Sequence, residues 1–137
     1  MDADVFLDTN IVLYACSAAP ADASKQARAA TLITGSRFAI SAQVMQEFVS
    51  NALRKPSLGI SEGGIDAFLE LCGNVTVMPV TRELILLATI IRRRHKVSHW
   101  DSTIIAAAQA LGCHTLYSED LSHGQVIDGV RVVDPFR

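Results

Sequence analysis

The sequence predicts an α/β fold in which helices flank a short, mostly parallel β-sheet. Short runs rich in β-branched and aliphatic residues recur along the chain, each long enough for one buried strand. Stretches with helical periodicity separate most of these runs, an alternation that is typical of parallel sheets. The chain has 137 residues, half of them hydrophobic, so we expect residues 1–137 to form a single domain with a sizeable core.

The individual elements follow from apolar runs and their boundaries. The predicted strands are residues 5–7, 37–40, 75–78, 115–117 and 130–133. Helices are expected to begin near residue 11, at 20–22, and at the capping residues Ser41, Ser61, Thr81 and Ser98. Pro56 ends the helix that follows Ser41, and Gly112 fits the position after the last helix.

Four acidic residues stand at the ends or on the faces of these apolar elements: Asp8, Glu47, Asp101 and Asp120. Asp8 directly follows the first strand, and Asp120 lies three residues past the fourth. In open parallel sheets, ligands gather outside the carboxyl ends of the strands. Helices that begin near this edge can bring Glu47 and Asp101 to the same place. We therefore expect all four carboxylates to meet in one pocket.

Each acidic residue also has a structural interpretation. Asp8 could cap a helix, although two other capping residues follow it. Glu47 could lie on a solvated helix face, and Asp101 completes an S-x-x-D capping pattern with Ser98. In the acidic loop after the fourth strand, we expect Glu119 to be the solvated member. The functional interpretation rests on the set of four.

A shared cation explains the set best. Ionised carboxylates beside an apolar core are costly unless they have a partner, and oxygen ligands suit Mg²⁺ or Mn²⁺. Such ions activate water and stabilise charge on a phosphoryl group. Without metal, mutual repulsion should raise at least one carboxyl pKa. The sequence contains no nucleophile elbow, no Walker A motif and no regularly spaced histidines, and its three cysteines lack C-x-x-C spacing.

The overall charge excludes the class of nucleic-acid-binding proteins whose whole surface is positively charged. The net charge is −2 and the pI is about 6.0, so nucleic-acid binding would need a local patch. Residues 92–96 form the basic cluster, in which Arg92 and Arg94 are candidate RNA contacts; the alternative is a helix end whose cations offset the dipole. With no signal-peptide pattern and no long apolar stretch, we expect a cytoplasmic protein without a membrane segment.

Four motifs follow one another along the chain: D-T-N at 8–10, the segment 41–48, W-D-S at 100–102 and Y-S-E-D-L at 117–121. Together they resemble the motifs of PIN-domain ribonucleases, and the tail 124–129 is also similar. Small single-domain members of that family are commonly VapC-like toxins of toxin–antitoxin pairs. The resemblance implies metal-dependent cleavage of RNA, a homodimer and a cognate antitoxin. It assigns the metal and catalysis to Asp8, Glu47, Asp101 and Asp120. Asn10 and Ser118 would support them.

Two other functions stay open at this point. A small-substrate phosphohydrolase of haloacid-dehalogenase type needs a D-x-D motif at a strand end, and here Thr9 and Asn10 follow Asp8. A PIN-like module that binds RNA or protein without cleavage would not need all four acids. With only 19% charged residues, we also expect the helices that begin near Asp22 and Ser61 to leave apolar surface for a second copy and an antitoxin segment.

Overall fold

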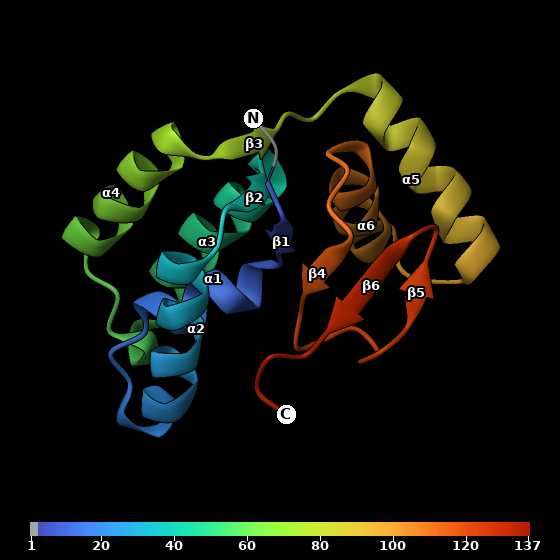
Figure 1. Cartoon of the computed structure of the whole chain (residues 1–137). Coiled ribbons are helices and arrows are strands. Elements are labelled where there is room, and N and C mark those ends of the chain that lie inside the picture. Colours follow the sequence, from blue (N-terminus) through green and yellow to red (C-terminus); the bar gives the residue numbers. More distant parts are fainter. Residues whose placement is uncertain (1–2) are drawn as a thin grey trace.

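The predicted α/β fold is confirmed by a computed structural model, which describes residues 3–137 (Figure 1). A six-stranded sheet has the order β3-β2-β1-β4-β6-β5. The strands are β1 Val5–Leu7, β2 Phe38–Ser41, β3 Thr76–Met78, β4 Thr115–Tyr117, β5 Val126–Ile127 and β6 Val130–Val133. All pairs are parallel except β5 with β6. The short antiparallel β5 was not predicted, and β2 lies one residue later than expected.

Six α-helices connect the strands: α1 Thr9–Cys16, α2 Ala23–Gly35, α3 Ala42–Arg54, α4 Glu62–Leu71, α5 Arg82–His95 and α6 His99–Ala110. Single 3-10 turns occupy Pro20–Asp22, Pro56–Leu58 and Cys72–Asn74. The hydroxyls of Ser41, Ser61, Thr81 and Ser98 cap α3, α4, α5 and α6, as predicted. At α1 the prediction was wrong in detail, because the helix begins at Thr9 and Asp8 is its cap.

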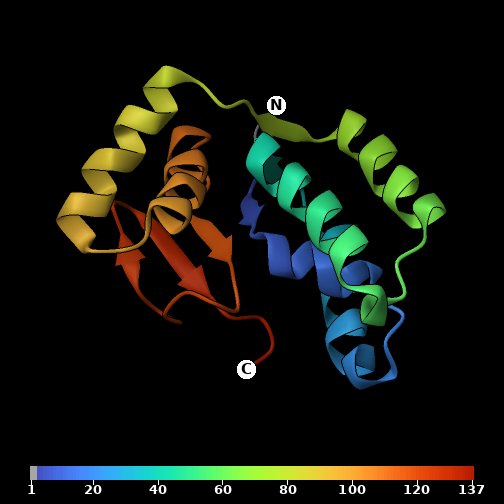
Figure 2. The same ribbon diagram turned by 180° about the vertical axis from the view of Figure 1, so that it is seen from behind.

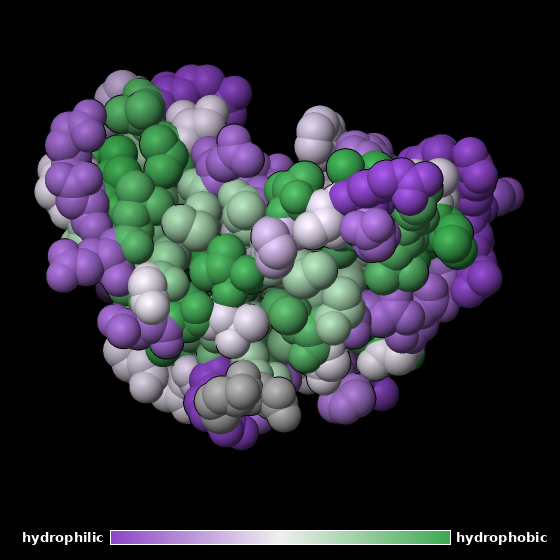
Figure 3. Space-filling model, turned by 90° about the horizontal axis from the view of Figure 1, so that it is seen from above, coloured by the Kyte–Doolittle hydropathy of each residue, from purple (hydrophilic) through white to green (hydrophobic). Residues whose placement is uncertain are grey.

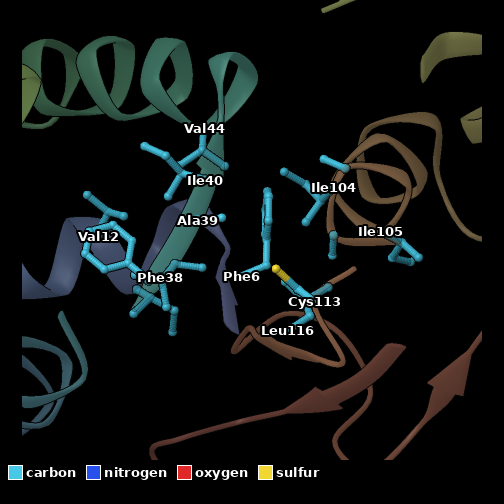
Figure 4. Packing of buried hydrophobic residues seen from close by; sticks show 14 of the residues in the cluster. Phe6, Val12, Phe38, Ala39, Ile40, Val44, Ile104, Ile105, Cys113 and Leu116 are labelled. Carbon is cyan, nitrogen blue, oxygen red and sulfur yellow. The ribbon is translucent and has the colours of Figure 1, made fainter. Parts of the chain in front are cut away.

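Helices cover both faces of the sheet. In Figure 4, Val12 of α1 and Phe38 lie on one side of β1, and Ile104 and Ile105 of α6 lie on the other. Phe6 of β1 is fully buried between them. Seen from behind in Figure 2, α5 and α6 lie side by side over the β4–β6 part of the sheet. Among residues 3–137, none of the helices has the length and apolar character needed to cross a bilayer.

The position of β1 determines where the acidic residues lie. It pairs with β2 on one side and with β4 on the other, and Leu7 is in register with Tyr117. The backbone N–H of Asp8 continues the ladder by donating to the Tyr117 carbonyl at 3.0 Å. The residues that follow Leu7 and Tyr117 are therefore neighbours at the carboxyl edge of the sheet, although they are 110 residues apart in sequence.

Candidate active site

A cavity of about 420 Å³ opens at the carboxyl edge of the sheet, and all four acidic residues line it. Asp8 lies between β1 and α1, Glu47 on α3, Asp101 in the first turn of α6, and Asp120 in the loop after β4. The remaining lining residues are Thr9, Asn10, Leu13, Tyr14, Gln43, Asn51, Lys55, Leu58, Trp100, Ile104 and Glu119. The topology thus brings together side chains from four separate segments.

Asp8 is the most buried of the four carboxylates, with 6% of the residue exposed. One of its oxygens accepts from the backbone N–H of Thr9 at 2.7 Å, and the other accepts from the Ser118 hydroxyl at 2.7 Å. Desolvation raises the pKa of Asp8 from 3.8 to about 6; the two hydrogen bonds lower it, and the charges of Asp120 and Glu47 raise it. A raised carboxyl pKa was predicted, but burial contributes more to it than mutual repulsion.

Glu47 is oriented by two uncharged donors. The Thr9 hydroxyl donates to Oε1 at 2.5 Å, and the Gln43 amide donates to Oε2 at 3.1 Å. Gln43 precedes Glu47 by one helical turn, so both side chains lie on the same face of α3. Sequence reasoning did not identify Thr9 or Gln43 as site residues. Their spacing from the acids, one residue after Asp8 and four before Glu47, is the available signal.

Asp120 is held by the two residues expected to support the site. The Asn10 amide donates to the Asp120 carboxylate at 2.9 Å, and the Asp120 backbone N–H donates to Ser118 Oγ at 3.3 Å. Ser118 is fully buried, so its hydroxyl links the Asp8 carboxylate to the loop that carries Asp120. Asp101 differs from the other three: its backbone N–H donates to the Ser98 cap at 3.0 Å, while no donor among residues 3–137 contacts its carboxylate.

The donor set consists of oxygen atoms, which suits Mg²⁺ or Mn²⁺ better than Zn²⁺. Among residues 3–137, however, no three Asp, Glu, His or Cys side chains are clustered closely enough to hold an ion as they stand. Three of the carboxylates accept hydrogen bonds from uncharged side chains, which hold them around the cavity wall. The oxygen ligands of these residues are chemically suited to a divalent cation, and their side chains would have to move closer together to share one.

The expectation for Glu119 was wrong. The Glu119 side chain is only 24% exposed. Its carboxylate forms an ion pair with Lys25 of α2 and accepts a hydrogen bond from the Tyr14 hydroxyl at 2.8 Å. Its backbone N–H donates to Asn10 Oδ1 at 3.3 Å. Glu119 therefore fastens the loop after β4 to α1 and α2, which fixes the position of the adjacent Asp120.

The basic cluster at residues 92–96 does not line the cavity. It closes α5, where Arg94 and His95 contact Asp128 at 3.5 and 3.3 Å, next to the β5–β6 turn. The cation that does line the cavity is Lys55, which lies two turns beyond Glu47 at the end of α3. Lys55 was not singled out in the sequence, because Arg54 and Lys55 form only a pair of cations at a helix end.

The chain belongs to the PIN domain family, whose model matches residues 5–126. Solved structures with the same fold include a toxin–antitoxin complex from Klebsiella pneumoniae, with a TM-score of 0.70 and 18% identity over 96% of this chain and 97% of that one. The Mycobacterium tuberculosis toxin VapC20, described as cleaving the sarcin–ricin loop, has a TM-score of 0.68 and 22% identity over 85% and 89%. DNA-bound VapBC from Salmonella typhimurium has a TM-score of 0.68 and 18% identity over 98% and 99%. No curated protein sequence matches the chain.

Proposed function

We propose that this protein is a metal-dependent endoribonuclease. The observation that carries the proposal is the cavity in which Asp8, Glu47, Asp101 and Asp120 meet at the carboxyl edge of a PIN-domain sheet. The raised pKa of Asp8 supports it, because desolvated carboxylates that face one another gain most from a bound cation. A structural neighbour with the same fold is described as a toxin that cleaves the sarcin–ricin loop.

The four carboxylates would hold Mg²⁺ or Mn²⁺, with Asn10 and Ser118 orienting two of them. A divalent cation at this site supplies Lewis-acid chemistry, which makes water more acidic and neutralises charge on a phosphodiester. Asp101 has no hydrogen-bond donor on its carboxylate among the described residues, so it is the acid best placed to accept a proton from the attacking water. Thr9 and Gln43 keep Glu47 directed along the cavity.

Cleavage of mixed single-stranded RNA tests this activity. We expect cleavage with Mn²⁺ or Mg²⁺ and none with EDTA. Asp101→Asn should abolish it without loss of fold, since the Asp101 carboxylate caps nothing. Asp66→Asn, an exposed acid on α4, is the matched control and should cleave normally. Metal-independent cleavage, or full activity in Asp101→Asn, would contradict the proposal.

An antitoxin is the proposed protein partner. A cavity of about 340 Å³ lies between α1, α2 and α4, and its lining is mostly apolar, including Cys16, Ile33, Phe68 and Leu71. Two of these helices, α2 and α4, are the ones that the sequence predicted to leave apolar surface, and Figure 3 shows apolar side chains gathered on the side where α4 lies. The neighbours from Klebsiella and Salmonella were solved as toxin–antitoxin complexes, which supports the same role here.

Growth of a bacterial host tests the toxin role. Expression of the chain should arrest growth, and co-expression of a small protein encoded next to its gene should restore it. Ile33→Glu should abolish this rescue while RNA cleavage persists, because the charge lies in the apolar groove and outside the acidic cavity. Rescue that is unaffected by Ile33→Glu would place the partner elsewhere.

A homodimer is also proposed. Ile85, Leu86 and Ile90 of α5 are 42%, 47% and 50% exposed, and Val80 just before the helix is 54% exposed. A monomer rarely exposes such a stripe. Light scattering at micromolar concentration should show a dimer, and Ile90→Glu should convert it to a folded monomer. A monomeric parent protein would refute the assembly.

A further inference from the structure

An exposed aromatic side chain lies at the mouth of the acidic cavity. Trp100 is the single tryptophan of the chain, and 64% of it is accessible to solvent. It lines the acidic cavity and also a second, more apolar cavity of about 560 Å³, as Gln43 and Glu47 do, so Trp100 lies where the two cavities adjoin. The next residue is Asp101. Trp100, Val80 and Ile85 line the second cavity and are 64%, 54% and 42% exposed, so they form an apolar patch of the kind that marks a binding surface.

The structure holds this ring in place although it is exposed. The Trp100 carbonyl accepts from the Gln43 amide at 3.3 Å and from the Thr103 hydroxyl at 2.7 Å. The His99 ring meets the indole edge-on, with centroids 4.8 Å apart. Trp100 therefore has a fixed backbone and a braced ring, so little conformational entropy is lost when a flat ligand stacks on it.

The floor of the cavity shows how a strand would continue from the ring. Gln43, Glu47 and Asn51 of α3 are spaced four residues apart, as is Lys55 directly after the helix, and all of them line the cavity. Trp100 is bonded to the first of them, and Lys55 is the last. At 1.5 Å per residue, this polar stripe is about 18 Å long. It begins at Gln43, which contacts Trp100, has Glu47 one turn further on, and ends at the Lys55 cation.

We propose that Trp100 stacks on a base of the single-stranded RNA substrate and that the strand runs along this stripe, with a backbone phosphate at Lys55. The inference rests on the proposed nuclease function. Stacking on an aromatic ring tolerates any base, so Trp100 contributes affinity without sequence preference. The proposed dimer contact includes Val80 and Ile85, which line the neighbouring cavity, so a second copy that also extends over Trp100 is the alternative occupant. A dry protein interface over Trp100 would desolvate Asp101 and Glu47, whereas a stacked nucleotide leaves them to water and cation.

Because Trp100 is the only tryptophan, intrinsic fluorescence reports on this side chain alone. Glu47→Gln protein with Mg²⁺ is titrated with an RNA octamer and with an octamer of the same length that lacks bases. We expect RNA to quench the emission and the abasic strand to bind without quenching. RNA that binds, as measured by anisotropy, without quenching Trp100 would overturn the proposal. Two results together would overturn the proposal in favour of the second copy. The Trp100 emission would change when the protein is diluted without RNA, and the Trp100→Ala variant would be a monomer.

Variants at Trp100 and Lys55 measure the contribution of each end of the stripe to RNA binding. Trp100→Ala should weaken RNA binding and raise KM by roughly 5- to 150-fold, with kcat nearly unchanged and Trp100→Phe retaining most of the affinity. Lys55→Gln should lower the salt slope of binding by about 0.7. Leu53→Ala is the control for surface truncation, because Leu53 is an exposed apolar residue of α3 that lies outside the cavity. An unchanged KM in Trp100→Ala refutes the inference alone, whereas RNA that quenches Trp100 but is never cleaved by the parent refutes the nuclease function alone.

Discussion

Replacing Asp8 with Asn should stabilise the metal-free protein at neutral and alkaline pH. The folded protein holds the Asp8 proton more tightly than the unfolded chain, because burial raises its pKa from 3.8 to about 6. The favourable contribution of this carboxyl is therefore complete below about pH 4 and is lost as the pH rises through about 6. Above that pH, the folded state must keep a desolvated charge that the unfolded chain leaves in water.

The size of the effect follows from the same values. The difference between 3.8 and about 6 corresponds to about 3 kcal/mol at 1.36 kcal/mol per pKa unit. Asn caps helices as well as Asp does, so the contact with the Thr9 N–H is retained. A less favourable contact with the Ser118 hydroxyl costs about 1 kcal/mol. The net gain is about 2 kcal/mol, which raises Tm by roughly 6 °C in a protein of this size.

Thermal melting in EDTA at pH 8 and at pH 4.5 measures this effect. The Tm of Asp8→Asn should be higher than that of the parent protein at pH 8, and this difference in Tm should shrink or disappear at pH 4.5. Asp66→Asn is the control, since it changes the same charge on an exposed helix face. A variant that melts below the parent at pH 8 would refute the reasoning, because it would show that the fold is stabilised by the ionised Asp8 cap.

Further expectations concern metal, pH and charge. Mg²⁺ should raise the Tm of the parent protein more at pH 8 than at pH 5, since protons compete for Asp8, and Asp8→Asn should lose most of that response. Ser118→Ala removes a hydrogen bond that lowers the pKa of Asp8, so the acid limb of the cleavage profile should move to higher pH. Glu119→Gln weakens the ion pair that fastens the loop and should reduce cleavage several-fold with little change in Tm. Replacing Arg92 and Arg94 with Ala should lower the salt slope of RNA binding by about 0.7 for each phosphate that the variant no longer neutralises, with unchanged metal affinity; an unchanged slope would leave the pair as helix-end charges.

The sequence was sufficient for the framework of the fold. The strand at β1, the caps at Ser41 and Ser98 and the helix end at Pro56 depend on local chemistry, and the structure has them as expected. The meeting of the four acids could also be anticipated, because parallel strands end at a common edge. For Asp8, the helix-cap role and the site role were treated as alternatives, but the residue has both positions: it caps α1 and lines the cavity.

The parts that were missed depend on tertiary neighbours. Thr9 and Gln43 are uncharged residues on helix faces, and their role appears only when Glu47 lies between them. Glu119 resembles any loop acid until α2 brings Lys25 beside it. The strand β5 has two residues and is formed by pairing with β6, so its own sequence carries no periodicity that could reveal it.

The central position of β1 has a consequence for synthesis. Asp8 is synthesised 110 residues before its partner Ser118, and the acid at Asp120 follows two residues later. A nascent chain that has not yet made β4 leaves one side of β1 unpaired and has only part of the cavity wall. At 5 to 20 residues per second, the ribosome takes about 5 seconds or more to reach β4 from β1. The acidic cavity therefore cannot be completed before residues 115–120 have been made, so the ribosome that makes the chain is not exposed to a finished site until then.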